Sequence, residues 1–198
     1  MKIIQVKKSE TKNMLDLYLS DNTVLTVYEE DYYGMHLYDK EKFTQSDIVD
    51  IKSATSERLG RAYAIKMILY KKRTKKEISD KLVDKGIEQQ IIDKILQKLE
   101  KEGYVDDVLY AQKLIRKMQG QNKSKKQIEL EFLIRGLQDE DVLKLLDEYD
   151  FDEQALQNLF DKKFANKDLN DQKTKIKAYN FFKSKGFSYE IIRKYVKI

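Results

Sequence analysis

Two short stretches with paired lysines are the parts of this sequence best suited to binding chemistry. They read TKKEI at residues 74–78 and SKKQI at residues 124–128. In each, Thr or Ser is followed three residues later by Glu or Gln, a capping-box pattern that predicts a helix capped by the hydroxyl residue. Both lysines then lie in the first helical turn, at the positive end of the helix dipole, where each exposed charge costs about 0.3–1 kcal/mol.

This cost occurs at equivalent positions of two stretches, which invites a functional explanation. Free N–H groups and lysines at a helix start can bind a phosphate or an acidic protein surface. Lysines are equally common on any solvated helix, so the sequence leaves both interpretations open. With neighbouring basic residues included, the candidate phosphate-binding residues are Arg73, Lys75, Lys76, Lys125, Lys126 and Arg135.

Catalytic equipment is not apparent, and the sequence predicts a protein that is not an enzyme. The only histidine, His36, has no serine or paired carboxylates at a recognisable spacing and is expected at the surface or a sheet edge. Asp106 and Asp107 directly precede a predicted helix, so they are expected to act as N-caps. Cysteine is absent and no glycine-rich phosphate loop follows a strand, so no metal and no cofactor is expected.

The lysine stretches belong to a unit of about 50 residues that occurs three times. Gly86, Gly136 and Gly186 mark the repeat, each following a basic residue and preceding an apolar one. Such a glycine fits the position just after a helix, where the backbone turns left-handed. Each unit is predicted to form three short helices around a small apolar cluster, and neighbouring units to share a continuous core.

Apolar spacing assigns core positions within the units. The stripe predicted for the first helix of the first unit consists of Leu59, Ala62, Ile65 and Leu69. Leu109 and Leu133 in the second unit, and Ile176 in the third, are assigned to the core as well.

The third unit departs from the other two because it lacks a capping box. Its second helix is expected to start earlier, near Asn170 or Asp171. Phe181 and Tyr189 fall outside its main apolar stripe and are the aromatic residues expected to make exposed contacts.

The first part of the chain follows a different pattern. Residues 3–27 alternate between apolar and polar types, with Ile4 and Val6 in the first run and a turn signal at residues 20–22. This predicts a small antiparallel sheet of about three strands, followed by a helix from Ser46 onward. The predicted domains are a β-rich extension at 1–55 and three-helix repeats at 56–104, 105–150 and 151–198.

Charge is unevenly distributed over the 198 residues. The net charge is +5, and residues 1–52 carry 7 Lys against 10 Asp and Glu, which leaves +8 on the remainder. A basic excess on the repeats suits phosphates or an acidic protein surface, and also a well-solvated helical surface. No apolar run approaches the roughly 20 residues that span a bilayer. Without cysteine or a signal peptide, a cytoplasmic protein with no membrane contact is expected.

Several separated motifs can be compared with known families: KRTKKEI at 72–78, KG at 85–86, EGYVDD at 102–107, KFA at 163–165 and GFSYEII at 186–192. Together they resemble the RecX family, regulators of the RecA recombinase, and the resemblance covers about residues 57–198. The N-terminal sheet is similar to an extension seen in members from low-GC Gram-positive bacteria.

The resemblance implies a mainly α fold of three tandem three-helix repeats in an elongated, curved array. It implies a monomeric regulator in DNA repair and recombination that binds RecA and the RecA–single-stranded DNA filament and suppresses ATPase activity and strand exchange. It further implies direct contact with DNA. Two alternatives remain open: a stand-alone, sequence-tolerant DNA-binding protein, and a helical adaptor for an acidic protein partner.

Overall fold

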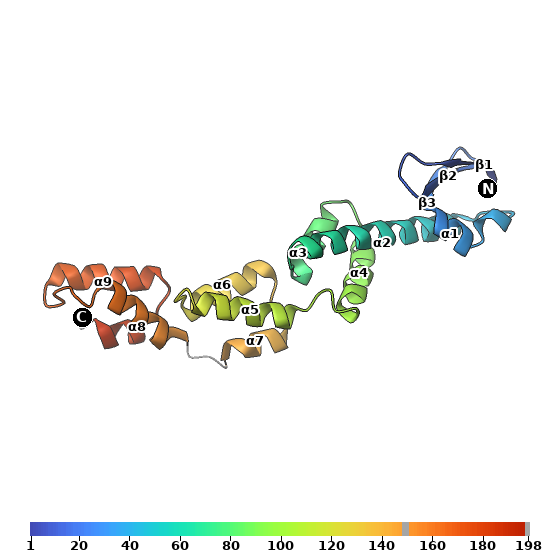
Figure 1. The fold of residues 1–198 in the computed structure, drawn as a ribbon. Coiled ribbons are helices and arrows are strands. Elements are labelled where there is room, and N and C mark those ends of the chain that lie inside the picture. The colour runs from blue at the N-terminus through green and yellow to red at the C-terminus, as the bar shows by residue number, and fades with distance from the viewer. Residues whose placement is uncertain (148–150, 197–198) are drawn as a thin grey trace. The chain divides into compact units, whose positions relative to one another are not determined.

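The protein, in a computed structural model that describes residues 1–147 and 151–196, is mainly helical with a small three-stranded N-terminal sheet (Figure 1). This confirms the predicted fold class. The chain divides into two compact units. Unit 1 comprises residues 1–71 and 79–104, and unit 2 comprises residues 72–78 and 105–198.

The predicted sheet is confirmed, with strands β1 (Ile3–Lys8), β2 (Met14–Leu19) and β3 (Val24–Tyr28) antiparallel in that order. One face is buried against the following helices, because alternate residues such as Leu17, Leu25 and Val27 point to the same side. The assignment of the first strand's apolar face needs correction. Ile4 is 66% exposed and Val6 38%, so these two side chains lie on the solvent face of β1.

After the short helix α1 (Glu29–Gly34) and a 3-10 turn (Leu37–Asp39), unit 1 continues with α2 (Gln45–Tyr70). Helix α2 crosses the boundary proposed at residues 55 and 56, which stays a prediction. The apolar stripe predicted for this helix is wrong, because Leu59 and Leu69 are 43% and 76% exposed, whereas Ala64 and Ile68 are buried.

The reason for this error is close packing around a glycine. Gly60 faces α4 (Gln89–Lys101), and a Cβ added there would lie 2.7 Å from Ile87 Cδ1 and 2.8 Å from Ile95 Cδ1. The smallest residue of the segment therefore faces the neighbouring helix, and the buried stripe runs through Gly60, Ala64 and Ile68, four residues apart.

The first repeat is built from the end of α2, α3 (Lys75–Val83) and α4. The other repeats are built from six further helices: α5 (Asp107–Gln119), α6 (Lys125–Arg135), α7 (Glu140–Asp147), α8 (Phe151–Lys163), α9 (Gln172–Ser184) and α10 (Tyr189–Tyr195). Helices α5 to α7 enclose one apolar cluster, centred on Phe132, and helices α8 to α10 enclose another, centred on Phe182. The repeat boundary predicted at residues 150 and 151 adjoins residues 148–150, which lie outside the described part.

Local predictions for the repeats were partly right. Gly86, Gly136 and Gly186 all have positive φ, and Asp171 caps α9 as expected. The core assignments contain three errors, since the structure exposes Leu109 by 45%, Leu133 by 57% and Ile176 by 52%.

The start of α2 provides a test of the fold by pH. The carboxylate of Asp47 accepts hydrogen bonds from Lys40 Nζ at 2.6 Å, and from the Thr44 backbone N–H and hydroxyl at 2.7 and 2.8 Å. These bonds, the one from Lys40 first, lower the pKa of Asp47 to about 2. Because the unfolded chain has a carboxyl pKa of about 3.9, the stabilisation is fully present above that value and is lost as the pH falls toward 2.

We therefore expect Asp47→Asn to lower the Tm at pH 7, and the difference from the wild type to narrow progressively below pH 4. Melting curves recorded by circular dichroism between pH 2 and 7 measure this. Asp50→Asn changes an exposed carboxylate of the same helix and serves as the control. A Tm difference that stays constant down to pH 2 would contradict the assignment.

Candidate binding surface at the repeat joints

The start of α3 is joined to the end of α6 by a buried hydroxyl. Thr74 caps α3, accepting the backbone N–H of Glu77 at 3.2 Å, and its own N–H donates to the Glu77 carboxylate at 3.4 Å. The predicted capping box is therefore present. The Thr74 hydroxyl also donates to the backbone carbonyl of Arg135 at 2.8 Å, across 61 residues of sequence. We call this contact the first joint.

The same interaction recurs one repeat later, where it forms the second joint. Ser124 caps α6, and its hydroxyl accepts the Gln127 N–H at 3.4 Å and donates to the Lys185 carbonyl at 2.7 Å. The sequence separation is again 61 residues. Both hydroxyl groups belong to residues that are completely buried. Within unit 2, the N-terminus of one middle helix therefore meets the C-terminus of the next repeat's middle helix.

Each joint packs directly on a glycine of the repeat. A Cβ at Gly136 would lie 2.5 Å from Lys76 Cβ, and one at Gly186 would lie 2.7 Å from the Ser124 hydroxyl oxygen. At Gly86, by contrast, no atom lies within 4 Å of such a Cβ. Positive φ explains a glycine at all three positions. Close approach of the preceding repeat is a second reason at Gly136 and Gly186, which the sequence did not reveal.

Carboxylates offset the lysine charge at both helix starts. The backbone N–H of Lys75 donates to Asp107 at 3.0 Å, and Lys75 Nζ lies 3.2 Å from the Asp139 carboxylate. At the second joint, Lys125 Nζ lies 3.1 Å from Asp147. An acidic group near a helix N-terminus is favourable. These carboxylates therefore offset the electrostatic cost of placing lysines at a helix N-terminus.

The two adjacent aspartates act on different helices. Asp106 caps α5 as predicted, accepting the Leu109 N–H at 2.8 Å. Asp107 is buried and instead bonds to the start of α3. The expectation that both cap the helix that follows them was therefore right for Asp106 only.

Arg135 is held by several partners at the first joint. Its guanidinium donates to Glu77 and to the Tyr110 hydroxyl, both at 2.8 Å, and to Glu131 at 2.9 Å. Burial lowers the pKa of Arg135, but the hydrogen bond that Arg135 donates to Glu131 and the nearby charges outweigh it and leave the pKa above its ordinary value. Arg135 is therefore charged and positioned within the joint.

The structure gathers the six candidate residues into two groups. Arg73, Lys75, Lys76 and Arg135 lie at the first joint, and Lys125 and Lys126 at the second. The 11 residues of α6 separate the groups by about 16 Å. Lys76 and Lys126 are exposed, whereas the other four are half-buried. This exposure makes Lys76 and Lys126 the members best placed to meet a partner.

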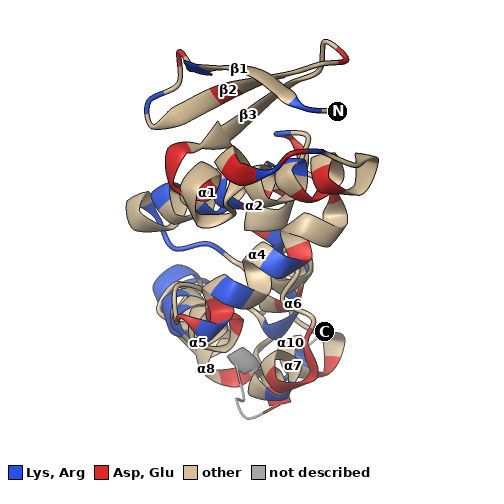
Figure 2. Ribbon diagram, turned by 90° about the vertical axis from the view of Figure 1, so that its right-hand side faces the viewer, with Lys and Arg blue, Asp and Glu red and all other residues tan. Residues whose placement is uncertain are grey.

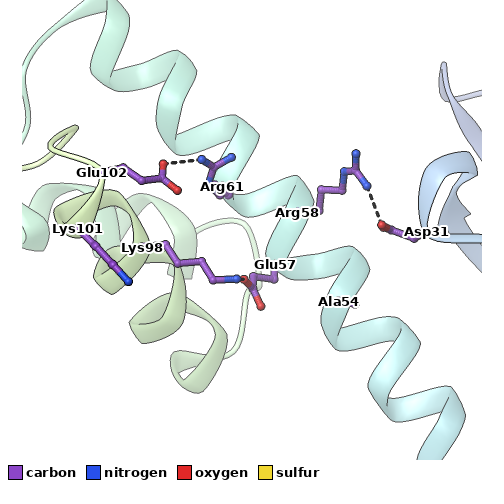
Figure 3. Close-up of a pocket in the computed structure, with 8 residues that line it drawn as sticks. All are labelled: Asp31, Ala54, Glu57, Arg58, Arg61, Lys98, Lys101 and Glu102. Carbon is purple, nitrogen blue, oxygen red and sulfur yellow. Dashed lines mark hydrogen bonds and ion pairs between the residues drawn. The ribbon is translucent and has the colours of Figure 1, made fainter. Parts of the chain in front are cut away.

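Unit 1 contains a separate cleft of about 780 Å³ beside α2. Figure 3 shows its charged side chains pairing across the cleft: Arg58 with Asp31 at 2.6 Å, Arg61 with Glu102 at 2.5 Å, and Lys98 with Glu57. Because the charges largely neutralise one another, the cleft offers neither an anion site nor a cation site. Within residues 1–147 and 151–196, no cluster of His, Asp and Glu could hold a metal ion.

Removing the glycine at the first joint tests the close approach. We expect Gly136→Ala to destabilise the protein by about 2 kcal/mol or more, because a side chain there combines a left-handed backbone with a collision against Lys76. Gly120→Ala, at a helical φ of −60° with no neighbour nearer than 3.6 Å, should change stability by less than about 0.5 kcal/mol. Urea unfolding measures both. Equal changes in the free energy of unfolding for the two substitutions would contradict the close approach at the first joint.

The joint hydroxyl can be tested in the same way. Thr74→Val should cost about 1–2 kcal/mol and accelerate hydrogen exchange of the Glu77 N–H, because the cap is lost and the Arg135 carbonyl loses its donor. Thr74→Ser retains the hydroxyl and should preserve most of the protection. Slow exchange at Glu77 in the valine variant would argue against the cap.

Comparison with known proteins agrees with this architecture. The family model described as RecX, first three-helix domain, matches residues 61–99, and the RecX third three-helix domain matches residues 152–196. The regulatory protein RecX of Streptococcus pyogenes serotype M5 is 28% identical over 202 residues, covering 98% of this chain and 75% of the relative. RecX of Streptococcus uberis is 27% identical, covering 96% and 75%.

Solved structures give the same result. The crystal structure of RecX from Lactobacillus salivarius superposes with a TM-score of 0.63 at 28% identity, covering 73% of this chain and 96% of that one. Another structure of regulatory protein RecX reaches a TM-score of 0.70 over 99% and 98% of the two chains, and at 20% identity it supports the fold. Over nearly its whole length the chain is therefore similar to regulatory proteins of the RecX family.

Proposed function

We propose that this protein binds RecA and the RecA–single-stranded DNA filament, and that it inhibits the ATPase and strand exchange of the recombinase. The observation that carries the proposal is the RecX relationship, which extends over 98% of the chain. The recombinase as partner comes from the family resemblance of the sequence motifs. Regulation by binding requires no catalytic group, and a surface of suitable shape and charge is sufficient.

The repeat joints support binding to a polyanionic target. Lys76 and Lys126 are exposed and lie at opposite ends of α6, one at each joint. The joints are hydrogen-bonded and close-packed, so the spacing between the two charges is held by the structure. Positive charge presented at a fixed spacing suits a target that itself repeats, such as a filament.

The distribution of charge favours an acidic target only modestly. Both signs are interspersed along the helices (Figure 2), while residues 53–198 carry the basic excess. A modest excess of this kind favours association with an acidic surface without dominating it. Among the described helices, none is both long and apolar enough to cross a membrane.

The assay for this function is the ATPase activity of RecA on single-stranded DNA with substoichiometric additions of the protein. We expect the ATPase rate of RecA to fall as the protein is added. No effect at any ratio would reject the proposal. Binding to bare oligonucleotide that falls steeply with salt, without any effect on RecA, would instead favour the stand-alone DNA-binding alternative.

The contribution of the joint lysines can be separated from that of overall charge. We expect Lys76→Glu combined with Lys126→Glu to raise the concentration for half-inhibition about three- to tenfold, because both exposed charges are reversed. Lys113→Glu combined with Lys162→Glu makes the same change in net charge at exposed positions away from the joints. For this pair the concentration for half-inhibition should change less than twofold, because the reversed charges lie away from the joints. Equal loss in both pairs would show that only net charge matters.

A further inference from the structure

Helix α6 exposes a row of large aliphatic side chains between the two joints. Leu130 is 51% exposed, Leu133 57% and Ile134 69%. Single exposed apolar residues are ordinary, but several within about one helical turn form a contiguous patch. Such a patch in a folded protein marks an interaction surface more often than it occurs without a role.

The repeat architecture provides an internal comparison for this patch. Fifty residues away, the positions of Leu130 and Ile134 are occupied by Asp80 of α3 and Asp84 just after it, and by Asn180 and Ser184 of α9, all exposed. The three-helix fold therefore accepts polar residues at these sites. At these two positions the aliphatic side chains are particular to the middle repeat, whereas Leu133 corresponds to the exposed Val83 of α3.

The patch borders a groove between α5 and α6, entirely within unit 2, with a volume of about 370 Å³. Leu130 and Ile134 line one side, and Leu114 and Met118 of α5 contribute further apolar surface. Lys117 and Lys123 supply positive charge to the lining, and neither makes an ion pair with a described residue. The groove therefore combines an apolar strip with basic side chains, and the acidic residue of its lining, Glu131, is paired with Arg135.

A buried hydrogen-bond acceptor lies in the same groove. The side-chain oxygen of Gln127 is buried and accepts no hydrogen bond from the residues that the structure describes. A buried polar atom without a partner is costly. An N–H group of a bound segment could satisfy it.

We infer that the α5–α6 groove binds an acidic, amphipathic segment of the protein partner. The apolar side chains of that segment pack on Leu130 and Ile134, and its carboxylates face Lys117 and Lys123. Charge complementarity identifies the occupant, because an apolar surface flanked by unpaired cations matches a segment with both apolar and acidic residues. The inference rests on the proposed function, for which it names the chemistry of one contact with the recombinase.

Two other occupants fit the groove less well. Nucleic-acid bases stack on aromatic side chains, and none of the described residues that line this groove is aromatic. A second copy of the chain in a two-fold dimer would place Lys117 and Lys123 against the same lysines, which repel one another. A protein segment with acidic residues avoids both difficulties.

The closing experiment uses the full chain and a variant with polar residues taken from α9, Leu130→Asn with Ile134→Ser. The matched control is Val83→Ser, which removes an exposed aliphatic side chain from α3, 53% exposed, outside the groove. Circular dichroism verifies that each variant is folded. The probe is a fluorescein-labelled amphipathic peptide of Glu and Leu, compared by anisotropy with a peptide in which Lys replaces Glu.

We expect the wild type to bind the acidic peptide and not the basic one, and the groove variant to bind it at least about tenfold more weakly. The control variant should remain within about twofold of the wild type. The variant Lys117→Gln with Lys123→Gln should also bind more weakly, chiefly at low salt. Equal binding of both peptides, or unchanged binding by the groove variant, overturns the inference.

The same proteins are then compared in the RecA ATPase assay and by sedimentation. If the wild type and the groove variant inhibit RecA equally, the inference fails while the proposed function stands. If the wild type leaves RecA unaffected but the peptide results hold, the proposed function fails while the groove remains a site for another acidic segment. A wild-type dimer that the groove substitutions dissociate, or loss of single-stranded DNA binding in that variant, overturns the inference in favour of a second copy or of nucleic acid.

Discussion

The structure of unit 2 depends on a hydrogen bond from the N-cap hydroxyl of one repeat to a helix-end carbonyl of the next. Thr74 and Ser124 each accept a backbone N–H of their own helix and donate to Arg135 or Lys185. Both hydroxyl groups are buried, so breaking the contact would leave a donor and a carbonyl without partners. This penalty opposes separation of neighbouring repeats. The hydrogen bond also holds the helix end of each following repeat directly against the cap.

This contact also gives the paired lysines two different roles. The first lysine of each pair has a structural partner, since Lys75 meets Asp139 and Lys125 meets Asp147. The second of each pair is exposed beside the joint. Ion pairs at a half-exposed surface contribute only about 0–1 kcal/mol to stability, so they mainly fix the positions of Lys75 and Lys125. Binding through a cation that is already held in place loses less conformational entropy than binding through one on a mobile loop.

The aliphatic patch lies on α6, with Lys126 at the start of this helix and Lys76 of α3 packed on Gly136 just beyond its end. Its two ends belong to the joints, and its middle turn carries Leu130 and Ile134. Charge at the ends can guide an acidic partner toward the surface, whereas apolar contact in the middle slows its release. A helix anchored at both ends presents these groups in a constant geometry.

The amino-acid sequence by itself determined the features that depend on near neighbours in the chain. These include the caps at Thr74 and Asp171 and the helix exit at Gly136, because capping and left-handed turns involve residues a few positions apart. Periodicity also predicted helices, but not which side of α2 is buried. That side is the one on which Gly60 admits the closest approach of Ile87 and Ile95.

Only the tertiary structure decided which residues form the joints and which charges lie beside them. The bonds from Thr74 to Arg135 and from Lys75 to Asp107 span 61 and 32 residues, and no local pattern marks either partner. The physical reason is that a side chain's partner across a repeat is chosen by packing, which places distant residues within hydrogen-bonding distance.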